Sequence, residues 1–107
     1  MSLDVTLTRV QPTEVFSANI THNLGKMARA AGIYMELWRP EEIGITHAGQ
    51  LVAPLEAGLD KLLDDPKTYK QLDAINGWGV YEQFIPWLKA YIAACKEWSD
   101  ATVESSR

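Results

Sequence analysis

The hydrophobic repeat changes twice along this chain, and the change limits the folds that the chain can adopt. Near the N-terminus, Leu3, Val5 and Leu7 alternate with polar residues, which is the period-two pattern of a half-buried strand. Residues 101–106 repeat this pattern more weakly, and the residues between the two segments follow a helical period instead. Two strands this short need each other and a helical layer behind them. We therefore expect the two terminal segments to pair in antiparallel fashion.

Helical segments are expected to fill the middle of the chain. Asn19 is a plausible N-cap for the first, because its side-chain oxygen can accept unpaired backbone N–H groups. Residues 48–63 form the broadest apolar stripe, Asp65-Pro66 opens a short helix, and residues 81–98 form the last. The predicted fold is mainly α (α+β), a single domain over residues 1–107. It is a compact helical domain of about four helices with a short antiparallel two-stranded β-ribbon formed by the N- and C-terminal segments.

The charge and the hydropathy of the chain limit the cellular locations and the binding partners that we expect for it. The chain has 107 residues and a net charge of −4, and its basic residues are scattered without a stripe that would neutralise phosphates. Direct nucleic-acid binding is therefore disfavoured. No apolar run approaches the roughly 18 residues of a membrane span, and the N-terminus lacks a secretory signal pattern. We expect a cytoplasmic protein without a membrane span, and a symmetric dimer is the default oligomeric expectation.

Signatures of catalysis and metal binding are absent from the sequence. His22 and His47 have no second Cys or His at ligand spacing, and the lone Cys95 lies among apolar residues. No nucleophile elbow, P-loop or dinucleotide-binding glycine pattern occurs. We expect no metal and no cofactor, and the sequence favours a non-catalytic role over an enzyme.

Two polar segments are the first candidates for a ligand site. Asn19, Thr21, His22 and Asn23 would occupy the first turn of the predicted helix, where unpaired N–H groups favour a phosphate or carboxylate. The alternative is that Asn19 caps the helix while the other polar side chains are simply solvated.

The second segment is the loop that precedes the last predicted helix. Gly77 and Gly79 flank Trp78 and leave its indole without bulky neighbours, so Trp78 could form a stacking platform together with Tyr81. Asn76 and Glu82 complete this candidate segment. A loop tryptophan that covers the end of the helical bundle is the alternative.

Arg39 is a further candidate because it follows Tyr34 and Trp38. A guanidinium can clamp a phosphate or carboxylate with two parallel hydrogen bonds and can stack on an aromatic ring. It could equally satisfy the C-terminal carbonyl groups of the helix before it.

The pattern Asn19-Ile20-Thr21-His22-Asn23-Leu24, followed by Leu37-Trp38-Arg39-Pro40 and residues 76–82, resembles a family of small phage, prophage and bacterial proteins. The resemblance spans nearly the whole chain. The family has no established activity, so the resemblance implies a context and no mechanism. His47 departs from the pattern and receives little functional weight.

We therefore expect a phage or mobile-element binding protein that holds a small anionic or nucleotide-like ligand without catalysis. Its predicted ligand-binding residues are Asn19, Thr21, His22, Asn23, Arg39, Asn76, Trp78, Tyr81 and Glu82. Counter-defence by sequestering a host signalling nucleotide is one form of this function. The alternatives are a module that binds or inhibits a host protein, and a small hydrolase or transferase that uses His22 and Glu82.

Overall fold

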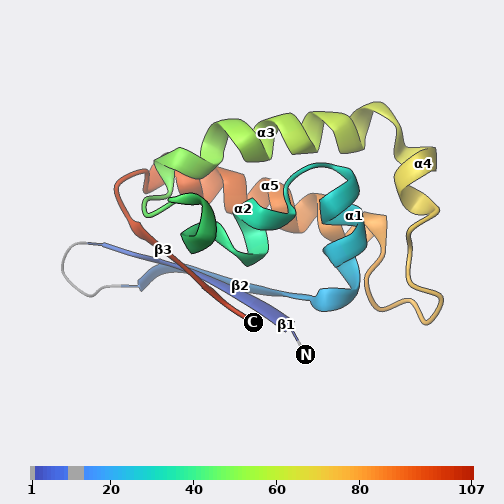
Figure 1. The fold of residues 1–107 in the computed structure, drawn as a ribbon, viewed down its shortest axis with the longest axis horizontal. Coiled ribbons are helices and arrows are strands. Elements are labelled where there is room, and N and C mark those ends of the chain that lie inside the picture. The colour runs from blue at the N-terminus through green and yellow to red at the C-terminus, as the bar shows by residue number, and fades with distance from the viewer. Residues whose placement is uncertain (1, 10–13) are drawn as a thin grey trace.

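The structure, a computed structural model that describes residues 2–9 and 14–107, has a β-sheet covered on one face by helices (Figure 1). The elements follow one another as β1 (Ser2–Thr8), β2 (Glu14–Thr21), η1 (His22–Leu24), α1 (Gly25–Ala30), α2 (Tyr34–Trp38), η2 (Pro40–Ile43), α3 (Gly49–Asp64), α4 (Pro66–Lys70), α5 (Tyr81–Glu97) and β3 (Thr102–Ser106).

The predicted two-stranded ribbon is wrong, because the sheet has three antiparallel strands in the order β2-β1-β3. β1 is central and pairs with β3 on one side, where Asp4 lies opposite Ser106. On its other side β1 pairs with β2, from Ser2 opposite Thr21 to Thr8 opposite Glu14. The strand β2 supplies partners for backbone groups of β1 that a two-stranded ribbon would leave unpaired.

The helix predicted to begin at Asn19 begins later, because Asn19 and Ile20 belong to β2. The helical content also differs from the prediction of about four helices, with five α-helices among the described residues. Thr21 caps η1, since its Oγ1 accepts a hydrogen bond from the backbone N–H of Asn23 at 3.3 Å. Gly32 has a φ of +78° and separates α1 from α2.

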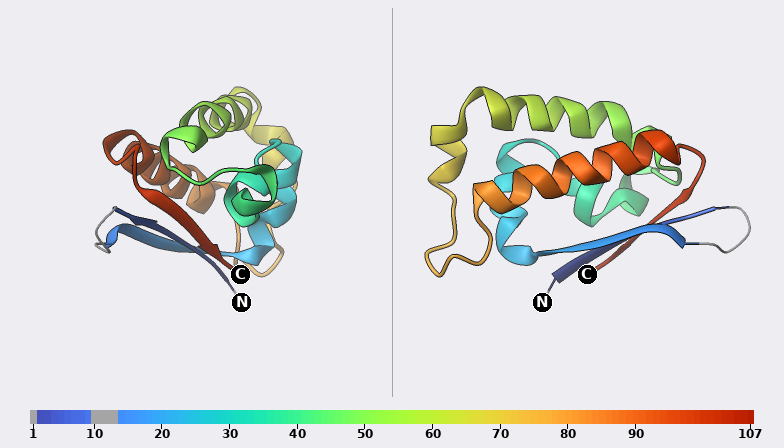
Figure 2. Two further views of the ribbon diagram at one scale, coloured as in Figure 1. Left: turned by 60° about the vertical axis from the view of Figure 1, so that its left-hand side comes forward. Right: turned by 180° about the vertical axis from the view of Figure 1, so that it is seen from behind.

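The core lies between the sheet and the helices, of which α2 and α5 contact the sheet while α3 packs on both of them. Leu3, Val5 and Leu7 of β1 are fully buried, as the period-two pattern predicts. Helices α3 and α5 run side by side above them (Figure 2), and Tyr81 at the start of α5 donates a hydrogen bond to the carbonyl of Leu62 at 2.7 Å. Within the described residues, no helix combines the length and the apolar character that crossing a membrane requires.

One end of the molecule brings together segments that are distant in sequence. There, β2 runs into η1 and α1, while residues 71–80 form the long connection from α4 to α5 (Figure 1). The two segments are joined by a hydrogen bond from Asn23 Nδ2 to the backbone carbonyl of Trp78, at 2.7 Å. This end of the molecule holds both cavities described next.

Candidate functional site

The loop around Trp78 is held against the turn that follows β2. The backbone N–H of Trp78 donates to Asn76 Oδ1 at 3.0 Å, and its carbonyl accepts from Asn23. Gly79 has a φ of +108°, and a Cβ built on it would lie 2.7 Å from the Cβ of Asn23. Glycine therefore permits an approach of the two backbones that a larger residue would prevent.

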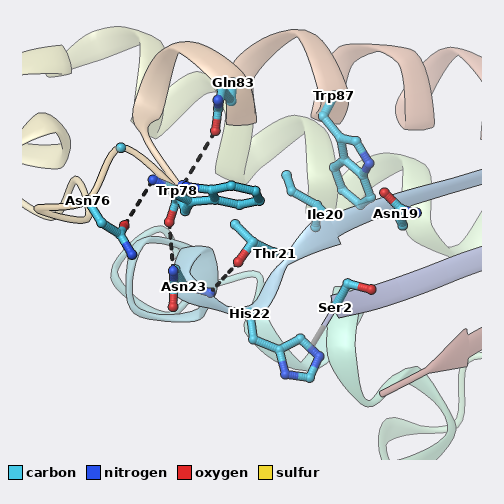
Figure 3. A pocket seen from close by; sticks show the side chains of 12 residues that line it. Ser2, Asn19, Ile20, Thr21, His22, Asn23, Asn76, Trp78, Gln83 and Trp87 are labelled. Atoms are coloured by element: carbon cyan, nitrogen blue, oxygen red, sulfur yellow. Dashed lines mark hydrogen bonds between the residues drawn. The ribbon is translucent and has the colours of Figure 1, made fainter.

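This contact forms one wall of a cavity that we call the hollow. It is open to solvent and has a volume of about 1180 Å³. Figure 3 shows the Trp78 indole extending from the loop toward Ile20 and Trp87, whereas the His22 ring points away from it toward Ser2. The hollow is lined by Ser2, Asn19, Ile20, Thr21, His22, Asn23, Asn76, Gly77, Trp78, Gly79, Gln83 and Trp87. Its lining combines uncharged polar side chains with apolar ones and contains no acid, lysine or arginine.

A second cavity, which we call the groove, adjoins the hollow and has a volume of about 970 Å³. It shares His22, Asn23 and Asn76 with the hollow. The groove is lined by His22, Asn23, Gly25, Lys26, Arg29, Tyr34, Trp38, Arg39, Gln71, Leu72, Asp73, Ala74, Ile75, Asn76 and Arg107. Of the ten basic residues in the chain, four line this one cavity, so the groove concentrates positive charge on an acidic protein.

Two of these four cations are engaged by glutamates. Arg39 donates to Glu42 at 2.7 Å, and this hydrogen bond is the main reason that the pKa of Arg39 is raised. Arg107 donates to the carbonyl of Trp38 at 2.6 Å and to Glu41 at 3.1 Å. The pKa of Glu41 is lowered, first by a hydrogen bond from its own backbone and then by Arg107. These exposed pairs orient the two arginines but contribute little to stability.

The other two cations, Lys26 and Arg29, are exposed and form no ion pair within the described residues. They stand three residues apart on α1. The guanidinium carbon of Arg29 lies 3.9 Å from the centroid of the Tyr34 ring, which gives the arginine a cation–π contact. Lys26 and Arg29 are therefore the groove cations with the least competition for an incoming anion.

The carboxylate of Asp73 has a structural role at the rim of the groove. Its Oδ1 accepts a hydrogen bond from the backbone N–H of Tyr81 at 2.7 Å. This bond satisfies an unpaired donor in the first turn of α5. The N-terminus of α5 is thus already occupied by a side chain of the protein itself.

The residues predicted from sequence separate into three groups in the structure. Six of them line the hollow, namely Asn19, Thr21, His22, Asn23, Asn76 and Trp78. Arg39 lines the groove. Tyr81 is buried, with its hydroxyl bonded to Leu62, and the exposed Glu82 pairs with Lys70 at 3.5 Å, so the structure brings neither to the site.

The predicted rationale for the turn after β2 also changes. Asn19 and Thr21 lie on a strand, and the helix α1 that follows η1 has only six residues. The dipole of so short a helix gives no basis for an anion site in this turn. Any charge-based binding must come instead from the side chains of the groove.

His47 lies at the far end of the sheet, where it bridges to Thr102, and it lines neither cavity. Within residues 2–9 and 14–107, no group of three or more potential metal ligands comes together.

Sequence reasoning missed Lys26, Arg29, Arg107 and the polar lining residues Gln83 and Trp87. Lys26 and Arg29 could have been found from their spacing, since residues three apart on a helix share a face. Arg107 could not have been found in this way, because it reaches the groove only through the pairing of β3 with β1.

Comparison with known proteins gives no relative: no family model, no curated protein and no solved structure matches this chain.

Proposed function

We propose that this protein binds a small anionic ligand in the groove, without catalysis. The observation that carries the proposal is the convergence of Lys26, Arg29, Arg39 and Arg107 on one cavity of about 970 Å³. A cavity of this volume has room for a small ligand. Guanidinium groups bind phosphate or carboxylate through paired, charge-assisted hydrogen bonds.

The free cations make the entry of an anion favourable. Lys26 and Arg29 need not release a carboxylate before they contact a ligand, whereas Arg39 and Arg107 must exchange theirs or share them. We expect Lys26 and Arg29 to supply most of the binding energy, and Arg39 and Arg107 to orient the anion.

A hydrolase or transferase that uses His22 and Glu82 has no support from the geometry. That reaction would require both side chains in one cavity, but His22 lines both cavities and Glu82 lines neither. The proposal is therefore a binding function. A cytoplasmic location and a role in counter-defence, by sequestering a host signalling nucleotide, belong to the same proposal and rest on the sequence pattern alone.

Binding of a protein partner is the second candidate, and one observation favours it. Ile75 and Trp78 are exposed, at 107% and 71%, within the same loop. Exposed apolar side chains that lie close together often mark interaction surfaces. A partner of this kind would lose affinity in a Trp78→Ala variant, which should leave the binding of pyrophosphate unaffected because Trp78 does not line the groove.

The test of the groove is titration calorimetry with inorganic pyrophosphate and with a pool of nucleotides, at low and high salt. We expect the double variant Lys26→Glu, Arg29→Glu to weaken binding by about tenfold or more. Arg39→Glu should also weaken binding while leaving the melting temperature nearly unchanged. Binding should weaken as salt is raised, because the groove is open to solvent.

The matched control is Lys67→Glu, Lys89→Glu, which makes the same change in net charge at exposed positions outside both cavities. If both double variants weaken binding equally, the overall charge of the protein and not the groove determines affinity. If neither pyrophosphate nor any nucleotide binds the wild-type protein, the proposed function is wrong.

A further inference from the structure

The groove offers charge but no free aromatic face. The Tyr34 ring is covered on one side by Arg29, at 3.9 Å, and it stacks with Trp38, with a centroid distance of 5.3 Å. Trp38 itself is only 2% exposed. A flat ring that entered the groove would therefore find no aromatic side chain on which to stack.

The hollow offers the opposite arrangement. None of its lining side chains is an acid, a lysine or an arginine, and it contains Trp78, which is 71% exposed. Within the described residues, the other exposed large hydrophobic side chains are Ile43, Leu63 and Ile75, and none of them is aromatic. Trp78 is thus the free aromatic platform of the site.

The backbone under Trp78 is fixed even though its indole is exposed. Its N–H and its carbonyl are both bonded to asparagine side chains, Asn76 and Asn23, and Gly79 is pressed against the turn. Leaving a large apolar side chain in water is unfavourable, and burial against a ligand would remove that cost. A rigid loop that presents an exposed indole is preorganised for stacking.

The edges of the hollow carry hydrogen-bonding groups suited to a polar ring. The amide side chains of Asn19 and Gln83 line it, and amides both donate and accept. One ring nitrogen of its lining, Trp87 Nε1, is buried and lacks a hydrogen-bond partner within the described residues. Buried polar atoms of native proteins are usually paired, so an acceptor atom on an occupant would supply what the chain does not.

The two cavities meet at His22, Asn23 and Asn76. We propose that they bind one ligand together, a nucleotide whose heteroaromatic base stacks on Trp78 in the hollow. Its phosphate contacts Lys26 and Arg29 in the groove, and its sugar passes over the three shared residues. This inference rests on the proposed function for the phosphate, and it adds the chemical class of the ligand.

The experiment uses titration calorimetry to compare AMP, GMP, CMP and UMP with their nucleosides and with ribose 5-phosphate, which carries the same phosphate without a base. At least one nucleotide should bind about tenfold or more tightly than ribose 5-phosphate, because base–aromatic stacking adds to the affinity. Trp78→Ala should remove that advantage and leave the affinity for ribose 5-phosphate unchanged. Trp78→Phe should retain most of it.

The matched control is Leu63→Ala, which removes an exposed apolar side chain outside both cavities. Indole fluorescence gives a second readout, since the stacking nucleotide should quench the wild-type protein more than the Trp78→Phe variant. A loss in Leu63→Ala as large as in Trp78→Ala would overturn the stacking role of Trp78.

The two proposals fail in different ways. If all four nucleotides bind no more tightly than ribose 5-phosphate, the base has no site in the hollow, and the groove proposal survives. If nucleosides bind as tightly as nucleotides, the hollow functions without the groove, and one ligand does not span both cavities. If neither ribose 5-phosphate nor a nucleotide binds, both proposals are wrong.

Discussion

The core where α3 packs on α5 is built differently from the end of the molecule where the turn after β2 meets the loop 74–79. In the first region, side chains such as Phe84, Leu88 and Leu55 are fully buried and hold the elements together. In the second, hydrogen bonds and the close approach of Gly79 to Asn23 fix the backbone, and Trp78 is left exposed.

This difference indicates which residues can be substituted without unfolding the protein. Stability comes chiefly from apolar side chains that are removed from water, whereas a binding surface needs side chains that remain available. The two cavities lie in the second region, where the side chains of Asn23 and Asn76 and the close approach of Gly79 hold the backbone. Substitution of a lining side chain that does not hold the backbone, such as Trp78, should alter binding far more than folding.

The largest expected difference between the two regions appears when one aromatic residue in each of them is replaced by alanine. Phe84→Ala should lower the free energy of unfolding by about 3–5 kcal/mol, because it leaves a cavity in the core. Trp78→Ala should change that free energy by less than about 0.5 kcal/mol, because the indole is largely solvated. Urea denaturation of both variants measures the contrast. An equally large loss for Trp78→Ala would mean that Trp78 belongs to the core.

An intermediate effect is expected at the glycines of the loop. Gly79→Ala should destabilise the protein by about 2–3 kcal/mol, because the backbone has a positive φ and the new Cβ would clash with Asn23. Gly77 has a φ of +76° but nothing within 4 Å of its added Cβ, so Gly77→Ala should cost only about 1 kcal/mol.

Urea denaturation measures the free energy of unfolding of both glycine variants. Titration with the nucleotide that binds the wild-type protein most tightly measures whether the hollow still binds its ligand. Gly79→Ala should also reduce nucleotide affinity by separating the loop from the turn. Equal destabilisation by the two substitutions would show that the contact with Asn23 does not hold the loop.

The smallest effect is a dependence of core stability on pH. Burial raises the pKa of Cys95 from 9.0 to about 12. Above pH 9 the unfolded thiol loses its proton while the folded thiol keeps it, so stability is complete below pH 9 and falls as the pH rises. Between pH 8 and pH 10 this thiol should account for a loss of about 1 kcal/mol.

Cys95→Ala is the variant that isolates this effect, measured by urea denaturation in the presence of a reductant. It should lose less stability over the same pH interval than the wild type. Identical pH profiles for the two proteins would mean that the thiol is accessible to water.

The sequence predicted the elements that carry a local signature, such as an alternating strand or a capped helix start. The alternation of Leu3, Val5 and Leu7 gave β1, and Asp65-Pro66 gave the start of α4, whose cap is the Asp65 side chain. The strand β2 was missed because Val15 and Phe16 are adjacent apolar residues, which breaks the alternation. Its last residues also fit a helical period, and only pairing with β1 resolves the ambiguity.

The candidate site was predicted in part for the same reason. Polar and aromatic residues near Gly79 mark a loop in the sequence, so Asn76 and Trp78 could be proposed without a structure. That this loop would meet Asn23 depends on a contact between residues 55 positions apart. The groove was missed because its cations come from α1, from Arg39 and from the end of β3, and single cations carry no periodic signal.

The central position of β1 has a consequence for the order in which the chain folds. Its pairing with β2 closes a short hairpin, whereas its pairing with β3 joins Asp4 to Ser106, almost the full length of the chain. Contacts between such distant residues are slow to form, because nearly the whole chain must be ordered before they are made. We expect the sheet to be completed last, after the helices have collapsed. A ribosome that still holds residues 102–106 would carry a protein whose groove lacks Arg107.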